Sequence, residues 1–156
     1  MAGCAGVAGP KTAEPVRATI EEYGIYTNLV FAGGAAENKW WVTGQEHVRT
    51  TTDVPFGEGL AFGYRFRLEG EPDAVDFGIM VPPDEDSPVQ LFYHFTRTAE
   101  ETRANPFIGY WMEPGGAVRC GAYELGIWHA GRLLCGKRFE VLPPGRGAEA
   151  DGGAEP

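Results

Sequence analysis

Positive charge and long apolar runs are both scarce in this chain. It has 13 Lys and Arg against 22 Asp and Glu, a formal net charge of −9, so its surface repels phosphate backbones and anionic lipid headgroups. We therefore expect no nucleic-acid partner and no electrostatic attraction to a membrane surface. No stretch approaches the roughly 20 consecutive apolar residues that a membrane-spanning helix needs, so the printed sequence predicts no such helix.

Cysteine is also scarce, and its spacing argues against a structural metal site. The three cysteines are Cys4, Cys120 and Cys135. They supply neither a pair of CxxC motifs nor a Cys/His cluster with zinc spacing. We expect the chain to turn back on itself at residues 129–131, which puts Cys135 across from Leu125 or Gly126. That position is several residues from Cys120, so the hairpin disfavours a disulfide between the two.

Cys4 carries a different prediction, because Met1-Ala2-Gly3-Cys4 resembles the end of a bacterial lipoprotein signal. Residues 5–15 are small and contain Pro and Gly, as expected of a tether between a lipid and a folded domain. The apolar part of a signal is missing, so this hypothesis requires Met1 to lie inside a longer signal. The simpler interpretation of residues 1–15 is an Ala/Gly-rich flexible leader. The lipoprotein hypothesis predicts an exported protein of the cell envelope or periplasm with a lipid on Cys4. The alternative is a cytoplasmic protein.

The remaining composition predicts an all-β domain. The chain has 23 Gly and 12 Pro, and this frequent punctuation favours many short strands. Alternating or β-branched stretches predict about seven to eight strands, and a single helical turn is expected at 99–104. The predicted strands cover residues 17–31, 40–52, 60–68, 74–81, 89–98, 107–112, 122–128 and 132–141. The natural arrangement is one antiparallel β-sandwich over residues 16–142, followed by a disordered tail at 143–156.

The strand at 60–68 shows the clearest pattern. Leu60, Phe62, Tyr64, Phe66 and Leu68 alternate with Ala61, Gly63, Arg65 and Arg67. Because successive side chains of a strand point to opposite faces, the first set is expected in the core and the second in solvent.

Three stretches together are similar to a known bacterial family. They are Glu22-Tyr-Gly-Ile-Tyr26, the run from Thr52 to Pro72, and Gly126-Ile-Trp-His-Ala-Gly-Arg132 followed by Lys137-Arg-Phe-Glu-Val141. The chain resembles the domain of unknown function 3859 family over residues 16–142. That resemblance implies an immunoglobulin-like β-sandwich, common in exported bacterial proteins, with no assigned activity and no site residues. His129 and Ala130 before Gly131 depart from the family pattern, which leaves the turn type open.

The residues that carry catalysis or bind metals do not form a recognisable motif. His47, His94 and His129 lie in different predicted elements, without a Gly-x-Ser-x-Gly elbow or a cysteine nucleophile motif. Glu21 and Glu22 are adjacent in a strand, so they are expected on opposite faces. These patterns predict a protein that is not an enzyme and that has no cofactor.

One acidic loop is a candidate for calcium. Asp84, Glu85 and Asp86 offer oxygen ligands, but the loop lacks the alternating carboxylates and the glycine of a dedicated calcium loop. We therefore expect a solvated loop and no metal site.

Adjacent aromatic residues are the remaining signal. Neighbouring rings in a strand must point to opposite faces, so either both faces of a sheet are covered or some rings are exposed. Exposed rings would form a ligand or partner surface, whereas outer rings could equally be shielded by loops or by Lys and Arg stems. The candidate surface residues are Trp40, Trp41, Tyr93, Tyr110, Trp111 and Trp128.

Two functions fit this sequence. The first is a non-enzymatic envelope domain that binds an unknown protein partner through a sheet face or an edge strand, with a membrane tether through lipid at Cys4. The alternative is a module that binds a small ligand or carbohydrate through the paired aromatics. An exposed apolar patch or an unpaired edge strand favours the first, and a pocket with convergent polar groups favours the second.

Overall fold

The computed structural model describes residues 14–33, 41–116 and 118–145. Within these residues the chain forms nine strands and one short helix. They are β1 (Arg17–Phe31), β2 (Val42–Arg49), β3 (Asp53–Pro55), β4 (Ala61–Glu69), β5 (Ala74–Val81), β6 (Leu91–Thr98), α1 (Ala99–Ala104), β7 (Phe107–Trp111), β8 (Gly121–His129) and β9 (Arg132–Leu142). No helix among the described residues is long and apolar enough to cross a membrane. The predicted leader up to residue 13, Cys4 and Trp40, and the tail from residue 146 lie outside the described residues.

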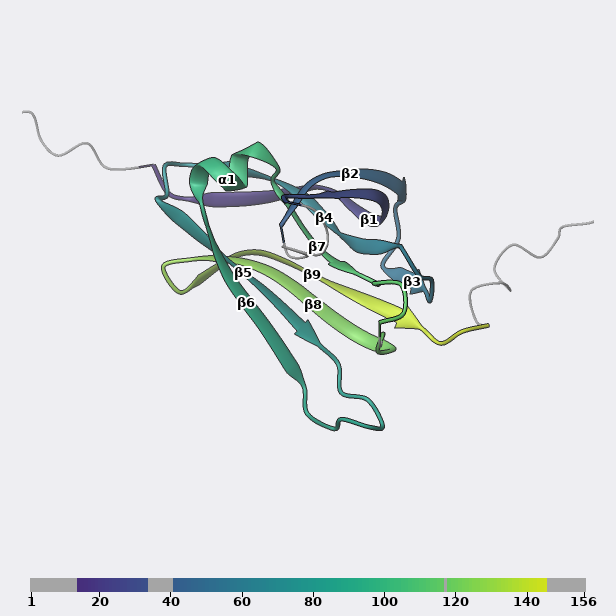
Figure 1. Cartoon of the computed structure of the whole chain (residues 1–156). Helices are drawn as coiled ribbons and strands as arrows, with labels where there is room; N and C mark the ends of the chain where they lie inside the picture. The colour runs from purple at the N-terminus through teal and green to yellow at the C-terminus, as the bar shows by residue number, and fades with distance from the viewer. Residues whose placement is uncertain (1–13, 34–40, 117, 146–156) are drawn as a thin grey trace, which may run out of the picture.

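The strands form two sheets that pack face to face, as the sequence predicts. One sheet has the order β2-β1-β4-β7 and the other β3-β9-β8-β5-β6. Figure 1 shows the first sheet above the second, with α1 at the top beside β6. The predicted all-β sandwich is therefore confirmed.

The core lies between the two sheets and is rich in aromatic rings. The fully buried large side chains are Tyr26, Tyr64, Tyr123, Phe62, Phe66, Phe77, Phe139, Ile79, Ile108, Met112, Leu125 and Ile127. All of these except Tyr26 belong to the main cluster between the sheets. Full burial of a side chain such as Phe or Leu contributes roughly 2 kcal/mol of transfer free energy, so this cluster is the main source of stability.

One strand was not predicted, and it breaks the antiparallel pattern. β3 pairs in parallel with β9, with Val54 opposite Val141. The sequence predicts one strand at 40–52, whereas β2 ends at Arg49 and the separate strand β3 begins at Asp53. The sandwich therefore has one strand more than the eight that the sequence indicates. Its five-stranded sheet contains both parallel and antiparallel pairs.

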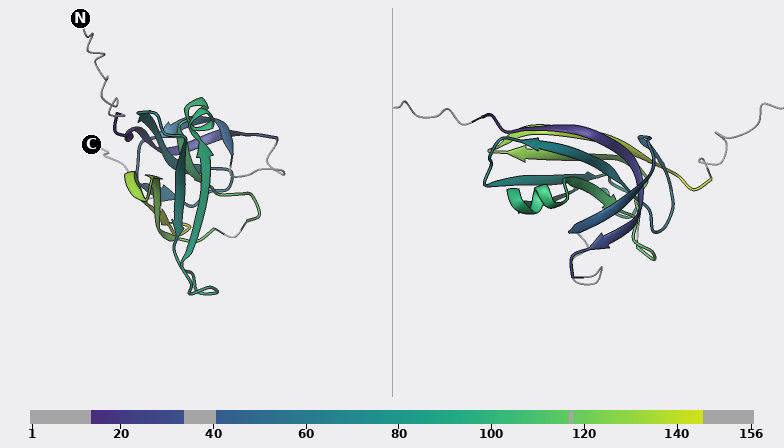
Figure 2. Two further views of the ribbon diagram at one scale, coloured as in Figure 1. Left: turned by 90° about the vertical axis from the view of Figure 1, so that its left-hand side faces the viewer. Right: turned by 90° about the horizontal axis from the view of Figure 1, so that it is seen from above.

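The outer face of β4 also differs from the prediction. Of the residues on that face, Ala61 and Gly63 are buried, whereas Arg65, Arg67 and Glu69 are exposed. The reason is the curl of β1, which has several register shifts and bends strongly in the right-hand view of Figure 2. The curl brings β2 towards β7, where the Asn105 side-chain amide donates to the Val42 carbonyl at 2.8 Å.

A second, smaller core fills the inside of this curl. Tyr26, Val42, Ala61 and Phe107 are its buried members. The rings of Tyr26 and Phe107 meet edge to face, with centroids 4.8 Å apart. The first sheet is thus covered on both faces near β7, which excludes water from positions that strand alternation places outside.

The β8–β9 hairpin turns where the sequence predicts. Ala130 and Gly131 both have positive φ, 48° and 74°, between the paired residues His129 and Arg132. Two positive-φ residues in a two-residue loop define the type I′ turn, which matches the twist of the flanking strands. An irregularity after Ile127 places Cys135 opposite Ile127 and not opposite Leu125 or Gly126, and Cys120 and Cys135 are both free thiols.

The helix confirms the expected single turn at 99–104. Thr98 accepts a hydrogen bond from the Glu101 amide at 3.2 Å, and the Glu101 carboxylate accepts one from the Thr98 amide at 2.9 Å. This reciprocal capping box satisfies two amides that the first helical turn leaves unpaired. It ends β6 and directs the chain across to β7.

Candidate binding surfaces

β6 is the most accessible edge among the described strands. It forms the end of the five-stranded sheet and pairs with β5 over all eight residues without a register shift. The other edges are protected: β2 pairs irregularly, β3 has three residues and ends in Pro55, and β7 has five residues. β6 contains neither Pro nor Lys, two of the residues with which proteins blunt an exposed edge.

Side chains along β6 alternate in direction. Tyr93 and Phe95 are half-buried towards the core, whereas Phe92 is 54 % exposed on the outer face. The Phe95 ring stacks on Phe77 of β5, with centroids 5.1 Å apart. The adjacent aromatic pair at Phe92 and Tyr93 is therefore split between the two faces, as the strand pattern requires.

A hollow of about 420 Å³ runs beside this edge. It is lined by Trp41, Tyr93, His94, Phe95, Thr96, Arg97 and Glu101. A second hollow, of about 240 Å³, shares Tyr93 and continues towards β7, where Tyr110 and Trp111 line it. The fold thus brings together four of the candidate aromatic residues, and all four are half-buried. Trp40 lies outside the described residues.

Arg97 closes the end of the larger hollow nearest the helix. Arg97 is 7 % exposed. Its guanidinium carbon lies 5.1 Å from the ring centroids of Phe77 and Phe95 and 5.9 Å from the ring centroid of Trp41. Burial lowers the pKa of the guanidinium, and the nearby Glu101 carboxylate raises it. These cation–π contacts hold β6 against the core and fix the wall of the hollow.

Tyr110 lies on the inner face of β7, opposite Phe62. Its ring packs against Tyr123 with centroids 5.0 Å apart. Burial is the main cause that raises the pKa of Tyr110, and the neighbouring Tyr93 adds to it. The phenol is therefore a neutral hydrogen-bonding group at the wall of the smaller hollow.

Trp128 is separate from the other candidate aromatics. It lies on the outer face of the five-stranded sheet, opposite Asp76 of β5. Its nearest aromatic neighbour is Phe92, whose ring stands at 85° to the indole with centroids 6.4 Å apart. The candidate residues therefore divide between two surfaces, one beside the β6 edge and one on the outer face.

The three histidines lie on three different strands and have different partners. The His47 ring is 3.1 Å from the Tyr23 carbonyl and 4.0 Å from the Glu22 carboxylate. His94 is 3.7 Å from Asp76, and His129 ends β8. Across the described residues, no group of three or more His, Cys, Asp or Glu side chains could hold a metal ion.

Glu21 and Glu22 correct a prediction. The pairing of β1 with β4 shifts between Ile20 and Glu22, so Glu21 is an extra residue in a bulge. Glu21 reaches Arg67 at 3.4 Å, and Glu22 accepts a hydrogen bond from Tyr26 at 3.3 Å. The bulge cancels strict alternation, so the expected opposite placement of the two carboxylates was wrong.

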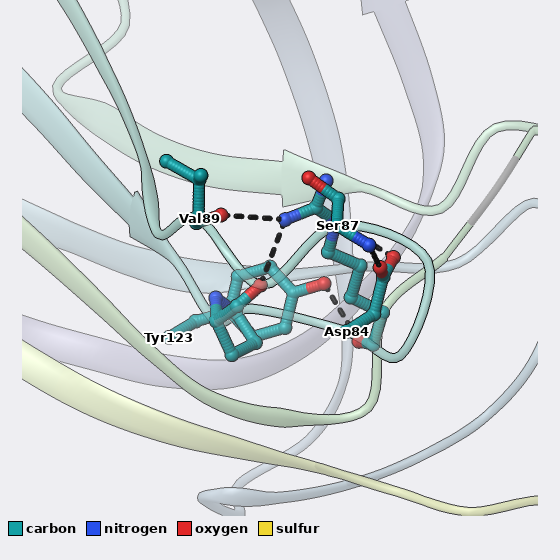
Figure 3. A network of polar contacts seen from close by, with 6 residues as sticks. Asp84, Ser87, Val89 and Tyr123 are labelled. Atoms are coloured by element: carbon teal, nitrogen blue, oxygen red, sulfur yellow. Dashed lines mark hydrogen bonds and ion pairs between the residues drawn. The ribbon is translucent and has the colours of Figure 1, made fainter.

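The acidic loop between β5 and β6 is held by an arginine. The Arg119 Nε lies 3.0 Å from Asp84 Oδ2, and its Nη1 donates to the carbonyls of Pro82 and Val89. The other Asp84 oxygen accepts from the Ser87 amide at 2.6 Å, and Figure 3 shows these contacts. Both carboxylate oxygens of Asp84 therefore contact protein groups, which hold the loop against Arg119.

Tyr123 anchors the same region. Its buried hydroxyl donates to the Arg119 carbonyl, four residues upstream, at 2.7 Å (Figure 3). A tyrosine near the start of a strand that bonds back to the preceding backbone is the tyrosine corner of immunoglobulin-like sandwiches. The tyrosine thus fixes the loop that carries Arg119 onto the core.

Comparisons with known proteins agree with this architecture. No protein-family model matches the chain, and no curated protein matches its sequence. The chain is similar to the crystal structure of an immunoglobulin-like protein from Pseudomonas aeruginosa, with a TM-score of 0.59 and 21 % sequence identity. The match covers 84 % of this chain and 99 % of that one. The fold is therefore an immunoglobulin-like β-sandwich.

Proposed function

We propose that this chain is a non-enzymatic module of the cell envelope that binds a protein partner at the β6 edge. The observation that carries the proposal is a regular eight-residue edge strand with an aromatic hollow beside it. An exposed edge offers unpaired backbone N–H and C=O groups to an incoming strand. The scattered placement of His47, His94 and His129 supports a binding role over a catalytic one.

The proposed interaction is strand addition. An extended segment of the partner pairs with the β6 backbone, and its alternate side chains enter the hollows lined by Trp41, Tyr93, Tyr110 and Trp111. In this mode main-chain hydrogen bonds supply affinity and side-chain pockets supply specificity. Half-buried aromatic walls suit this use, because they bury a large area with few freely rotating bonds.

A photo-crosslinking amino acid at Tyr93 tests the proposal in the native host. The matched control carries the same amino acid at Phe56, an aromatic that is 38 % exposed on the loop after β3. We expect a protein adduct of defined size from Tyr93, none from Phe56, and loss of the adduct in a Trp41→Ala background. The same adduct from both positions, or none from either, contradicts the proposal.

The envelope location has its own test. We propose that the native chain carries a lipid on Cys4, as the short run Met1-Ala2-Gly3-Cys4 suggests. Expression from the native locus with a clickable fatty acid should label the wild type and not Cys4→Ser. Unlabelled wild type in the cytosolic fraction contradicts the envelope location. Membership of the domain of unknown function 3859 family remains a prediction from the sequence.

The second candidate function, carbohydrate binding, has its support on the other surface. Trp128 lines a separate hollow on the outer face of the five-stranded sheet. Neither of the two hollows beside β6 is lined by Trp128. The two functions therefore make separate predictions for separate residues.

A further inference from the structure

A row of three glycines crosses the outer face of the five-stranded sheet. Gly78 of β5 is opposite Gly126 of β8, which is opposite Gly136 of β9. Because glycine has no side chain, the row leaves room above three neighbouring strands for other side chains; Gly78 and Gly126 are buried, and Gly136 is exposed. Glycine inside a strand weakens it and often marks a place where another group approaches closely.

The group that approaches is the indole of Trp128. A Cβ added to Gly126 would lie 2.4, 2.6 and 3.0 Å from Cη2, Cζ3 and Cζ2 of that ring. A Cβ points away from the sheet, so contact with three atoms of one six-membered ring means that the ring lies face down on Gly126. Trp128 is half-buried overall, so part of its ring remains accessible to solvent.

Two exposed apolar side chains flank this flat ring. Phe92 stands almost perpendicular to it, and its ring edge would lie 2.9 Å from a Cβ on Gly78. Leu133, opposite Trp128 on β9, is 53 % exposed. Together they make a floor and two walls around a hollow of about 350 Å³, which Glu124 and Arg138 also line.

The polar groups of this hollow are available to a ligand. Within the described residues, the Trp128 indole N–H donates no hydrogen bond, and it is not buried. Glu124 and Arg138 face each other across β8 and β9 and are both exposed. Neither forms an ion pair or a side-chain hydrogen bond in the described part of the chain. An aromatic floor thus has a donor, a carboxylate and a guanidinium beside it.

We propose that this surface binds a hexopyranose unit of a neutral glycan. The face of an aromatic ring is electron-rich and attracts the weakly positive C–H groups on the flat side of a sugar. Hydroxyls at the sugar edge pair well with a carboxylate and a guanidinium, since hydrogen bonds to charged groups are the stronger ones. Glu124 and Arg138 give this rim one acidic and one basic group, whereas the ammonium of Lys137, which also lines the hollow, lies 3.8 Å from the centroid of the Tyr23 ring. The net charge of −9 disfavours an anionic polymer.

This site rests on the second candidate function, carbohydrate binding, and specifies its ligand and residues; it does not depend on the proposed protein-binding function. The ligand would stack on Trp128 of β8, whereas the partner strand would pair with the edge of β6. Trp128→Ala should therefore remove sugar binding and leave the crosslink at Tyr93 intact.

The test is a titration of the ¹⁵N-labelled protein with chitohexaose and, separately, with cellohexaose, followed by NMR. The chain has four tryptophans, so the indole N–H signals of Trp128 and of the control Trp111 are distinguishable. We expect the Trp128 indole and the Gly126 amide to shift with a dissociation constant on the order of 1 mM, while the Trp111 indole stays in place.

Two matched glycine variants separate ring geometry from mere hydrophobicity. Gly126→Ala pushes the indole off the backbone, whereas a Cβ on Gly44 of β2, outside the hollow, would meet only the Val30 side chain, at 3.6 Å. We expect Gly126→Ala to weaken binding at least about tenfold, which corresponds to about 1.4 kcal/mol, and Gly44→Ala to leave it unchanged. If Gly126→Ala does not fold, Glu124→Gln and Arg138→Gln at the exposed rim should each weaken sugar binding, because each removes a charged hydrogen-bonding partner.

The proposal fails if the Trp128 signal stays unmoved by both sugars at about 10 mM, ten times the expected dissociation constant. It also fails if Trp111 shifts as much as Trp128, because that pattern indicates unspecific contact. A crosslink at Tyr93 that disappears with Trp128→Ala, without any sugar-dependent shift, would assign the outer face to the protein partner instead.

Discussion

Alkaline pH should unfold this protein through its buried tyrosines. Tyr26, Tyr64 and Tyr123 each have no exposed surface, and burial is the largest cause that raises the pKa of each phenol above its usual value. In the unfolded chain the same phenols ionise near pH 10. The folded state therefore keeps three protons that the unfolded state loses.

The sign and the size of the effect follow from this difference. A group whose pKa is raised by folding contributes its full stability below the unfolded pKa and loses it as pH rises towards the folded pKa. At about pH 11 each tyrosine lowers the free energy of unfolding by about 1.4 kcal/mol relative to about pH 8. These three tyrosines lower it by about 4 kcal/mol, a large part of the roughly 5–15 kcal/mol typical of a domain. Burial also raises the pKa of Tyr110 and of the Cys135 thiol, so both groups add to the same loss.

Urea unfolding followed by far-UV circular dichroism between about pH 8 and about pH 11 measures this loss. Tyr64→Phe is the matched control, since it removes one titrating phenol and keeps the ring. Over the same range its free energy of unfolding should fall by about 1.4 kcal/mol less than that of the wild type. Equal stability of the wild type at both pH values, or identical losses in wild type and variant, would refute the reasoning.

Three further changes test individual contacts, each by urea unfolding at neutral pH. Tyr123→Phe removes the 2.7 Å bond to the Arg119 carbonyl and should lower the free energy of unfolding by about 1 kcal/mol; no change would mean that the corner is not a stabilising contact. Thr98→Ala removes the acceptor for the Glu101 amide and should cost about 1 kcal/mol, with faster hydrogen exchange of that amide. Ala130→Asn should raise stability by up to about 1 kcal/mol, because Ala130 has a φ of 48° that asparagine tolerates better; a lower stability would contradict the assigned turn.

The parts of the fold that local sequence determines were predictable. β1, β5 and α1 begin and end where the sequence predicts, because residue types within each short segment and the turn residues around it indicate these bounds. The type I′ turn at Ala130 and Gly131 falls inside the expected hairpin. Gly131 marks that turn in the sequence, since it adopts positive φ without strain.

What the sequence could not give depends on contacts between distant segments. β3 has only three residues, too few for a periodicity, and it exists because β9 pairs with it. The burial of Ala61 and Gly63 arises from the curl of β1, which no alternation rule contains. Trp128 was named as a candidate for surface binding, but its separation from the other aromatics depends on the arrangement of the sheets.

The glycine row had a signal that was not used. Gly78, Gly126 and Gly136 each interrupt a predicted strand, and an isolated glycine inside a strand suggests close approach of another group. What could not be known is that the three are aligned across strands, because that requires the register of β5, β8 and β9. The strand register places these three glycines side by side, so they form one surface.

The position of β9 has a consequence for how the chain reaches this fold during synthesis. β9 is the last of the described strands, yet it lies inside the five-stranded sheet between β8 and β3. While the ribosome still holds the residues of β9, β8 has an open edge and β3 has no partner. Pairing β3 with β9 also closes a long loop, and such distant contacts fold slowly. The sandwich is therefore completed only after the C-terminal strand leaves the ribosome, and until then a nascent or truncated chain exposes strand edges that invite aggregation.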